Sequence, residues 1–254
     1  MENFLKRCWA NISIDNLQNN INIIKKHINK NTKIMAAVKA NAYGHGDKVI
    51  AKYLEEFGVS WFAVSNIEEA LALRSYGTKL PILILGATPA SYAKILYENN
   101  ITQSVFSKEY ANELSKEAQK ANVCVNAHIK IDTGMGRIGF SANINDIDKT
   151  INDLTNIYTD NNINCTGIFT HFSCASDLNN DSSAYTLKQF ESFKAICSLL
   201  TELGINVGLK HCSNSAAIIN YPQMQMDMVR PGIIIYGLSI SGDPNENNGT
   251  KPIM

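Results

Sequence analysis

"KIMAAVKANAYGHG" (residues 33–46) joins an unbroken apolar run to a lysine, a tyrosine, a histidine and two glycines. A strand that is apolar at every position is typical of a parallel sheet, where both of its faces are buried. The run ends at Lys39, so an amine follows directly on a buried strand, and the phenol of Tyr43 comes soon after. Because the active sites of parallel α/β folds lie where the strands end, this stretch predicts both a fold and a site.

Seven further runs of this kind follow along the chain. With the first, the predicted strands are 33–39, 61–65, 81–86, 102–106, 124–132, 165–172, 206–212 and 228–237. Amphipathic segments lie between most of them, and this alternation favours a parallel sheet closed into a (β/α)₈ TIM barrel. The length of 254 residues is usual for such a barrel. A doubly wound open sheet is the alternative, but no G-x-G-x-x-G motif opens any of the helices.

The segments between the strands carry helix signals. Residues 45–58 place their apolar side chains on one helical face, and residues 182–203 form the longest helical pattern. The helix predicted over 66–76 begins with a capping-box pattern, Ser65 with Glu68. Ser107 is a good N-cap for a helix over 107–121.

The two ends fall outside this alternation. Residues 1–12 contain "CWAN", which reads as an additional strand ahead of the first helix, and residues 13–240 form the predicted barrel. Residues 241–254 are rich in Asn, Gly and Pro and read as a linker. We expect the linker to lead to a second domain that is missing from this chain, and the N-terminal strand to pair with that domain.

The composition excludes several classes of function. Lys plus Arg and Asp plus Glu both number 23, so no net charge favours a nucleic acid or an anionic membrane as a partner. Six cysteines form no C-x-x-C pair and no zinc spacing, which predicts free thiols in a reducing cytoplasm and no metal site. The start of the chain lacks the apolar core of a signal peptide, and no later run is long enough to span a membrane.

Polar residues concentrate at the predicted strand ends, which meet at one rim of a barrel. They are Lys39 and Tyr43; Lys130, Asp132 and Arg137; His171; His211, Asn214 and Ser215; and Arg230, Gly232 and Ile233. An amine at the end of a buried run is poorly solvated and therefore nucleophilic, which suits a covalent link to a carbonyl cofactor such as pyridoxal phosphate. Placement alone leaves open a lysine that extends out of the barrel mouth without a role.

The other rim residues also have ordinary explanations. Gly232 and Ile233 follow the eighth strand, where barrels commonly bind phosphate, and Ser215 offers a hydroxyl, but a simple turn and an N-cap would look the same. His211 on its own is most easily explained as a core histidine. Arg230 is different, because a guanidinium buried without a partner is costly; we expect it to meet a partner or a cofactor.

Taken together, five motifs resemble those of bacterial alanine racemase, a fold-type III pyridoxal-phosphate enzyme. The motifs are "AVKANAYGHG", "HIKIDTGMGRIGF", "THF", "HCSNSAA" and "MVRPGIIIYG", and they run from the first predicted strand to the eighth. The resemblance implies a (β/α)₈ barrel that holds pyridoxal 5'-phosphate covalently on Lys39. It also implies a cytoplasmic homodimer that converts L-alanine to D-alanine for peptidoglycan precursors.

The resemblance implies a role for each of these rim residues except Asp132. Lys39, Arg137 and His171 become the catalytic residues. The phosphate is held by Tyr43, Ser215, Gly232 and Ile233. Arg230 donates to the pyridine nitrogen with His211 and Asn214 on its side, Arg137 donates to the phenolic oxygen, and His171 lies close to the ring. Lys130 aligns with a lysine that is often carbamylated in the family, which would give an anion beside Arg137.

Racemisation requires two proton-transfer groups, one on each face of the substrate. In the family the second is a tyrosine of the C-terminal domain, donated by the other subunit, so we expect this chain alone to be weakly active or inactive. Two alternatives stay open. One is the racemase domain of a serine/alanine racemase of the vancomycin-resistance type. The other, from another class, is a non-catalytic pyridoxal-phosphate carrier.

Overall fold

The computed structural model describes residues 9–243 and 248–254. Eight parallel strands pair in the order β8-β7-β5-β4-β3-β2-β1-β9 and form a barrel, and a ninth short strand, β6, pairs with β5. The strands are β1 Lys33–Ala37, β2 Trp61–Val64, β3 Ile82–Ile84, β4 Ile101–Val105, β5 Val125–Asp132, β6 Phe140–Ser141, β7 Ile163–Phe169, β8 Leu209–His211 and β9 Met228–Val229. The amide of Asp227 donates to the carbonyl of Lys210 (3.0 Å), which joins β9 to β8. The predicted barrel is therefore confirmed, and each of its eight strands overlaps a predicted run, although β4 and β7 begin one and two residues earlier than predicted.

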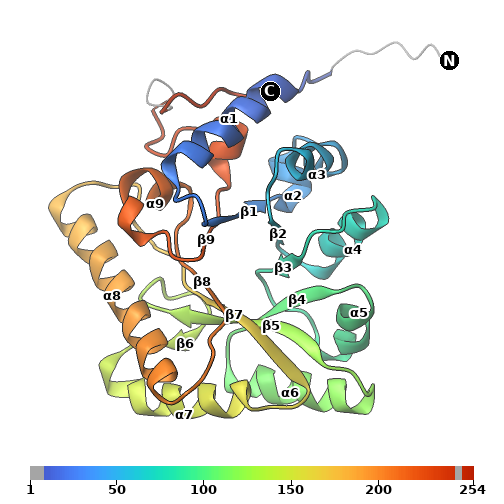
Figure 1. Cartoon of the computed structure of the whole chain (residues 1–254), viewed down its shortest axis with the longest axis vertical. Helices are drawn as coiled ribbons and strands as arrows, with labels where there is room; N and C mark the ends of the chain where they lie inside the picture. The colour runs from blue at the N-terminus through green and yellow to red at the C-terminus, as the bar shows by residue number, and fades with distance from the viewer. Residues whose placement is uncertain (1–8, 244–247) are drawn as a thin grey trace.

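Helices cover the outside of the barrel (Figure 1). They are α1 Ile14–His27, α2 Lys39–Tyr43, α3 Asp47–Glu56, α4 Ile67–Ser75, α5 Ala93–Glu98, α6 Lys108–Lys120, α7 Ile147–Tyr158, α8 Asn180–Glu202 and α9 Ser215–Asn220, with short 3₁₀ segments η1 Ala90–Tyr92, η2 Ile144–Asp146, η3 Pro222–Met224 and η4 Ile233–Tyr236. In the described part of the chain, no helix is both long and apolar enough to cross a membrane. Five cysteines in that part are free thiols, and Cys8 lies outside it.

Two helix starts were predicted from capping residues. Ser107 caps α6 as expected, with its hydroxyl accepting from the Tyr110 amide at 3.2 Å. The predicted capping box of α4 is wrong by one residue. Asn66, not Ser65, is the N-cap, and the carboxylate that reaches back to accept from the Ser65 amide (2.7 Å) belongs to Glu69, not Glu68. The shift arises because Ser and Asn are equally good caps and stand side by side here.

Residues 248–254 of the predicted linker are packed against the barrel. Residues 248–254 run beside α1 (Figure 1), and Ile253 is buried. The Asn20 side chain donates to the carbonyls of Ile235 (3.0 Å) and Lys251 (2.8 Å) and accepts from the Lys251 amide (2.7 Å). This segment is therefore docked rather than free. Of the predicted N-terminal strand, residues 1–8 lie outside the described residues and residues 9–12 have no strand pairing, so its pairing with a further domain stays a prediction.

Successive side chains along the strands point alternately to two apolar clusters. One set of strand side chains packs outward against the helices, and the alternate set forms a smaller apolar cluster inside the barrel with Met35, Ala63, Leu83, Phe169 and Met228. Bulky apolar residues usually fill such an interior. Here β5 and β8, together with the residue that follows β9, bring four buried polar side chains to the same interior: His128, Lys130, His211 and Arg230. This polar side of the interior marks the functional site.

Candidate active site

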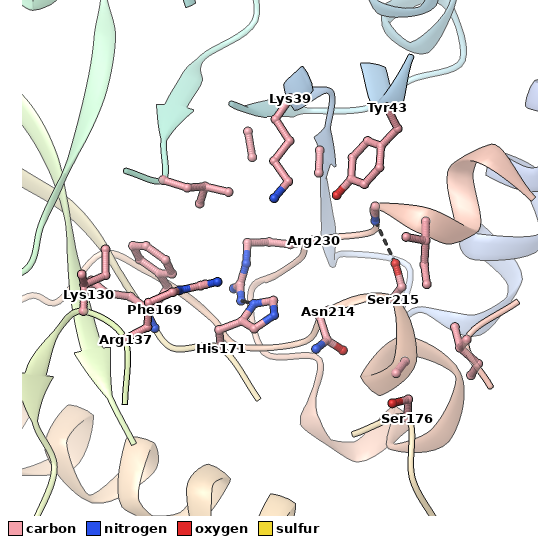
Figure 2. Close-up of a pocket in the computed structure, with 18 residues that line it drawn as sticks. Lys39, Tyr43, Lys130, Arg137, Phe169, His171, Ser176, Asn214, Ser215 and Arg230 are labelled. Carbon is pink, nitrogen blue, oxygen red and sulfur yellow. Dashed lines mark hydrogen bonds between the residues drawn. The ribbon is translucent and has the colours of Figure 1, made fainter. Parts of the chain in front are cut away.

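A cavity of about 310 Å³ opens at the carboxyl ends of the strands. It is lined by Lys39, Tyr43, Lys130, Arg137, His171, Asn214, Ser215, Arg230, Gly232 and Ile233, together with Phe169 and other apolar residues. Figure 2 shows Lys39 and Tyr43 on one side, Arg230 and His171 at the centre, and Lys130 with Arg137 on the opposite side. Of the rim residues predicted from the sequence, the cavity gathers all but Asp132 and His211, and His211 lies just beyond the cavity wall against Arg230.

Lys39 begins a turn of unusual handedness. Ala40, Asn41 and Ala42 have φ between 51° and 54° and ψ between 48° and 51°, so α2 is a left-handed turn. This conformation costs roughly 1–2 kcal/mol for each residue that carries a Cβ, and it persists because its surroundings hold it. The Glu69 carboxylate accepts from the Ala40 amide (2.7 Å), and the Asn41 side chain accepts from the Asp47 amide (2.9 Å). The turn places Lys39 and Tyr43 side by side, with the lysine nitrogen 5.9 Å from the centre of the phenol ring.

A second lysine at the site, Lys130, is more deeply buried than Lys39. Lys39, which we expected to be poorly solvated, is partly buried. Lys130 is 3% exposed, donates to the Ile131 carbonyl (3.1 Å) and lies 5.2 Å from the centre of the Phe169 ring. Burial, followed by the positive charge of Arg230, lowers the pKa of Lys130 to about 7. A large fraction of this amine is therefore neutral at neutral pH.

Arg230 is buried and its terminal nitrogens are fully used. Nη1 donates to the ring Nδ1 (2.9 Å) and the carbonyl (2.8 Å) of His211, and Nη2 donates to the Thr170 carbonyl. No ion pair in the described part of the chain involves Arg230. Burial lowers the pKa of this guanidinium to about 10, so it stays charged at neutral pH. The expected partners of Arg230 are thus neutral groups, and its charge has no counter-ion among the described residues.

Two predicted histidines contact this guanidinium. His171 lies 3.4 Å from Nη2 through its Nδ1, and His211 is completely buried. Burial and the neighbouring cations, Arg230 first, lower the pKa of His171 to about 3 and that of His211 well below its ordinary value. Both rings are therefore neutral. His211 is a buried histidine, as its sequence alone favoured, and it also orients Arg230.

The side of the cavity next to Tyr43 is built around Gly232. Its amide donates to the Ser215 hydroxyl at 2.9 Å, drawn as a dashed line in Figure 2. A Cβ on Gly232 would lie 3.0 Å from the Tyr43 hydroxyl, so the absence of a side chain lets that hydroxyl approach. Asn214, rather than Ser215, is the N-cap of α9, since its side chain accepts from the Ala217 amide at 3.0 Å. The Ser215 hydroxyl is therefore not used in capping the helix.

Arg137 comes from the glycine-rich loop between β5 and β6. The Asp132 carboxylate accepts from the amides of Gly134 (3.0 Å) and Gly136 (3.1 Å) and fixes the start of this loop. Residues 134–139, "GMGRIG", match the spacing of a dinucleotide-binding motif, but the loop leads into β6 and not into a helix N-terminus. Its function here is to carry an exposed arginine to the rim of the cavity.

Sequence reasoning missed two residues next to the site. His128 is completely buried and bonded to His211, although its position two residues before Lys130 puts both on the same face of β5 and could have revealed it. Glu69 braces the turn after Lys39 from a distant helix, and no local pattern indicates that contact.

The fold and the cavity define a parallel (β/α)₈ barrel with an amine and a buried guanidinium at the carboxyl ends of its strands. The sequence matches the family described as "Alanine racemase, N-terminal domain" over residues 12–240. This chain belongs to the alanine racemase family, whose members are fold-type III pyridoxal-phosphate enzymes.

Individual sequence relatives and solved structures support this family assignment. The chain is 43% identical to an alanine racemase of Clostridium tetani over 98% of its length and 63% of the relative, and 42% identical to alanine racemase 1 of Caldanaerobacter subterraneus subsp. tengcongensis over 89% and 56%. The solved structure of the Clostridium difficile 630 alanine racemase in complex with cycloserine superposes with a TM-score of 0.90 at 36% identity, covering 99% of this chain and 67% of that one. The alanine racemase of Bacillus anthracis with bound L-Ala-P gives a TM-score of 0.88 at 32% identity, covering 99% and 64%. The chain spans about three fifths of the length of the two named sequence relatives.

Proposed function

We propose that this chain is the cofactor-binding barrel of an alanine racemase, which interconverts L-alanine and D-alanine with pyridoxal 5'-phosphate. The observation that carries the proposal is that one cavity joins the Lys39 amine, the open side at Gly232 and the charged Arg230, which forms no ion pair with any described residue. The names of the relatives, and the L-Ala-P bound to one of them, support alanine as the substrate. Synthesis of D-alanine for peptidoglycan precursors, a cytoplasmic location and a homodimer belong to the same proposal and rest on the family resemblance.

The residues present fit the cofactor's phosphate. An anion needs donors on a backbone that it can approach closely, and Gly232 offers this because no Cβ fills the space next to Tyr43. The hydroxyls of Tyr43 and Ser215 and the backbone of Gly232 and Ile233 would hold the phosphate, with Asn214 fixing the start of α9. All of these groups line one side of the cavity.

The residues also fit the cofactor's ring. Both terminal nitrogens of Arg230 donate to the protein, which leaves its Nε to donate to the pyridine nitrogen. A guanidinium has no acceptor and does not give up its proton, so a ring nitrogen that accepted from Arg230 would stay unprotonated. Arg137 would donate to the phenolic oxygen from the opposite side, and His171, neutral and bonded to Arg230, would lie beside the ring.

When bound, pyridoxal phosphate supplies an aldehyde for a covalent link and a ring that withdraws electrons from the substrate's Cα. The part played by this chain is then to anchor the cofactor at Lys39 Nζ and, once substrate displaces that nitrogen, to accept or return a proton there. The left-handed turn keeps Lys39 close to Tyr43 and so aligns the amine with the phosphate side of the cavity.

Lys130 fits the carbamylation that we expected for it. A neutral amine is the form that attacks carbon dioxide, giving a carbamate and releasing one proton, and the lowered pKa of Lys130 supplies that form near neutral pH. The product replaces a buried cation near Arg230 and Arg137 with an anion, which relieves the repulsion between like charges. The carbamate would brace Arg137.

Of the residues that line the cavity, we assign a proton-transfer role to Lys39 alone, so we expect this chain by itself to bind the cofactor and to racemise weakly or not at all. The test is the visible absorbance of the chain with added pyridoxal phosphate, for wild type and Lys39→Ala, together with alanine racemisation measured by circular dichroism. A new absorbance band that Lys39→Ala abolishes is the expected result. Identical spectra for the two proteins would contradict the proposal.

A further inference from the structure

A chain of three buried side chains crosses the polar side of the barrel interior. Arg230 Nη1 lies 2.9 Å from His211 Nδ1, and His211 Nε2 lies 2.9 Å from His128 Nδ1. All three residues are buried, His128 and His211 completely. His128 lies outside the cavity described above, with its ring against Trp61 at 5.0 Å between centres.

The chemistry of the three groups fixes where each proton lies. Arginine only donates, so His211 Nδ1 must accept and carries no hydrogen. His211 is neutral, so its hydrogen is on Nε2 and points at His128 Nδ1, which must accept in turn. His128 is neutral as well, since burial lowers its pKa to about 3. The hydrogen of His128 is therefore on Nε2, and the three donors all point in one direction, away from the cavity.

The far end of this chain is unpaired. Within the described residues, Nε2 of His128 has no hydrogen-bond partner, and leaving a buried donor unpaired is costly. The ring can lie there because the neighbouring residue of β7 is Gly167, where a Cβ would come within 2.7 Å of Nε2. An apolar residue at position 128 would avoid the unpaired donor. Among the described residues, the hydrogen bond that this imidazole makes is thus the one in which its Nδ1 accepts from His211.

We propose that His128 is a positioning residue that holds His211 in the proton arrangement needed to orient Arg230 toward the ring nitrogen of the cofactor. The inference rests on the proposed function, because it is the cofactor that gives the orientation of Arg230 a use. Without the acceptor on His128, the Nε2 hydrogen of His211 would be buried and unpaired, and rotation of the His211 ring would withdraw Nδ1 from Arg230.

Two nearly isosteric variants separate this role from packing. His128→Asn and His128→Leu both remove the ring and leave similar volumes, but the asparagine oxygen takes the place of Nδ1 and the leucine offers no acceptor. The first measurement is the ¹⁵N spectrum of labelled histidines in the 254-residue chain without cofactor. We expect wild type and His128→Asn to show His211 with hydrogen on Nε2 and a bare Nδ1, and His128→Leu to lose this pattern.

The second measurement is the dissociation constant of pyridoxal phosphate, from absorbance titration. Loss of one hydrogen bond of ordinary strength predicts binding about 5-fold weaker in His128→Leu than in wild type, with His128→Asn close to wild type. His128→Phe, which fills more of the ring's volume, should behave like His128→Leu and replaces it if a cavity prevents folding.

Three results would overturn the inference: hydrogen on Nδ1 of His211 in wild type, an unchanged His211 spectrum in both apolar variants, or equal loss of cofactor affinity in the asparagine and leucine variants. Wild-type chain that binds no pyridoxal phosphate would instead count against the proposed function. In that case the histidine spectra still decide whether His128 holds the proton arrangement of His211.

Discussion

Gly232 and Tyr43 approach so closely that a Cβ on the glycine would lie 3.0 Å from the tyrosine hydroxyl. Gly232 has φ −126° and ψ −93°, outside the left-handed region, and the atom nearest to an added Cβ is the Tyr43 hydroxyl oxygen, so a side chain here acts first on that contact. Gly232→Ala should therefore leave the fold intact, displace the Tyr43 hydroxyl and weaken pyridoxal phosphate binding by about 10-fold, or ~1.4 kcal/mol. Absorbance titration measures the effect. Because Tyr43→Phe removes the hydroxyl, Gly232→Ala should cost less in that background, and equal costs in both backgrounds would count against the contact.

Glu69 holds the ends of two strands together, since its carboxylate accepts from the amides of Ala40 and Ser65, each at 2.7 Å. Glu69→Gln removes one of these two acceptors and should lower the free energy of unfolding by about 1–2 kcal/mol, as expected for a bond to a charged group. Urea denaturation measures it. The control is Glu68→Gln on the exposed side of the same helix, which should change stability by less than about 0.5 kcal/mol. Equal effects of the two variants would argue against the bracing role.

Lys130 should make stability depend on pH. Its pKa is about 7 in the folded chain and has its ordinary value of about 10.4 in the unfolded chain. Between these values the unfolded state binds more protons, so the free energy of unfolding should rise with pH, by at most ~1.4 kcal/mol per pH unit. The difference in stability between wild type and Lys130→Met, measured by urea denaturation from pH 6 to 8.5, isolates this contribution. A difference that stays constant across that range would contradict it.

Asn20 joins α1 to the docked segment through two hydrogen bonds with Lys251, and a third goes to the carbonyl of Ile235 in η4. Asn20→Ala leaves the Lys251 amide and two carbonyls without this partner, and we expect a loss of about 2–3 kcal/mol together with faster proteolysis near residue 251. Asn22→Ala, at an exposed position of the same helix, is the matched control and should change neither property. Unchanged proteolysis in Asn20→Ala would show that other contacts hold the segment.

The sequence predicts the barrel because strands buried on both faces need a continuous apolar run, and each such run proved to contain a strand. The sequence also predicts which residues lie together at the site, since parallel strands in a barrel all end at one rim. It does not predict the docked segment, because Asn20 binds main-chain atoms of residues more than 200 positions away. Nor does it show which lysine is desolvated. Lys39 and Lys130 both follow apolar residues, and the packing of the interior decides between them.

The left-handed turn after Lys39 inverts the usual preferences for substitution. In an ordinary helix glycine is among the worst replacements for alanine, whereas at Ala40 or Ala42, with φ near +50°, it relieves a steric penalty. Branched side chains such as valine and isoleucine should be eliminated there under selection for a folded product. Saturation mutagenesis of positions 40–42 would therefore enrich glycine, asparagine and aspartate, and that enrichment would record the handedness of the turn without any measurement of structure.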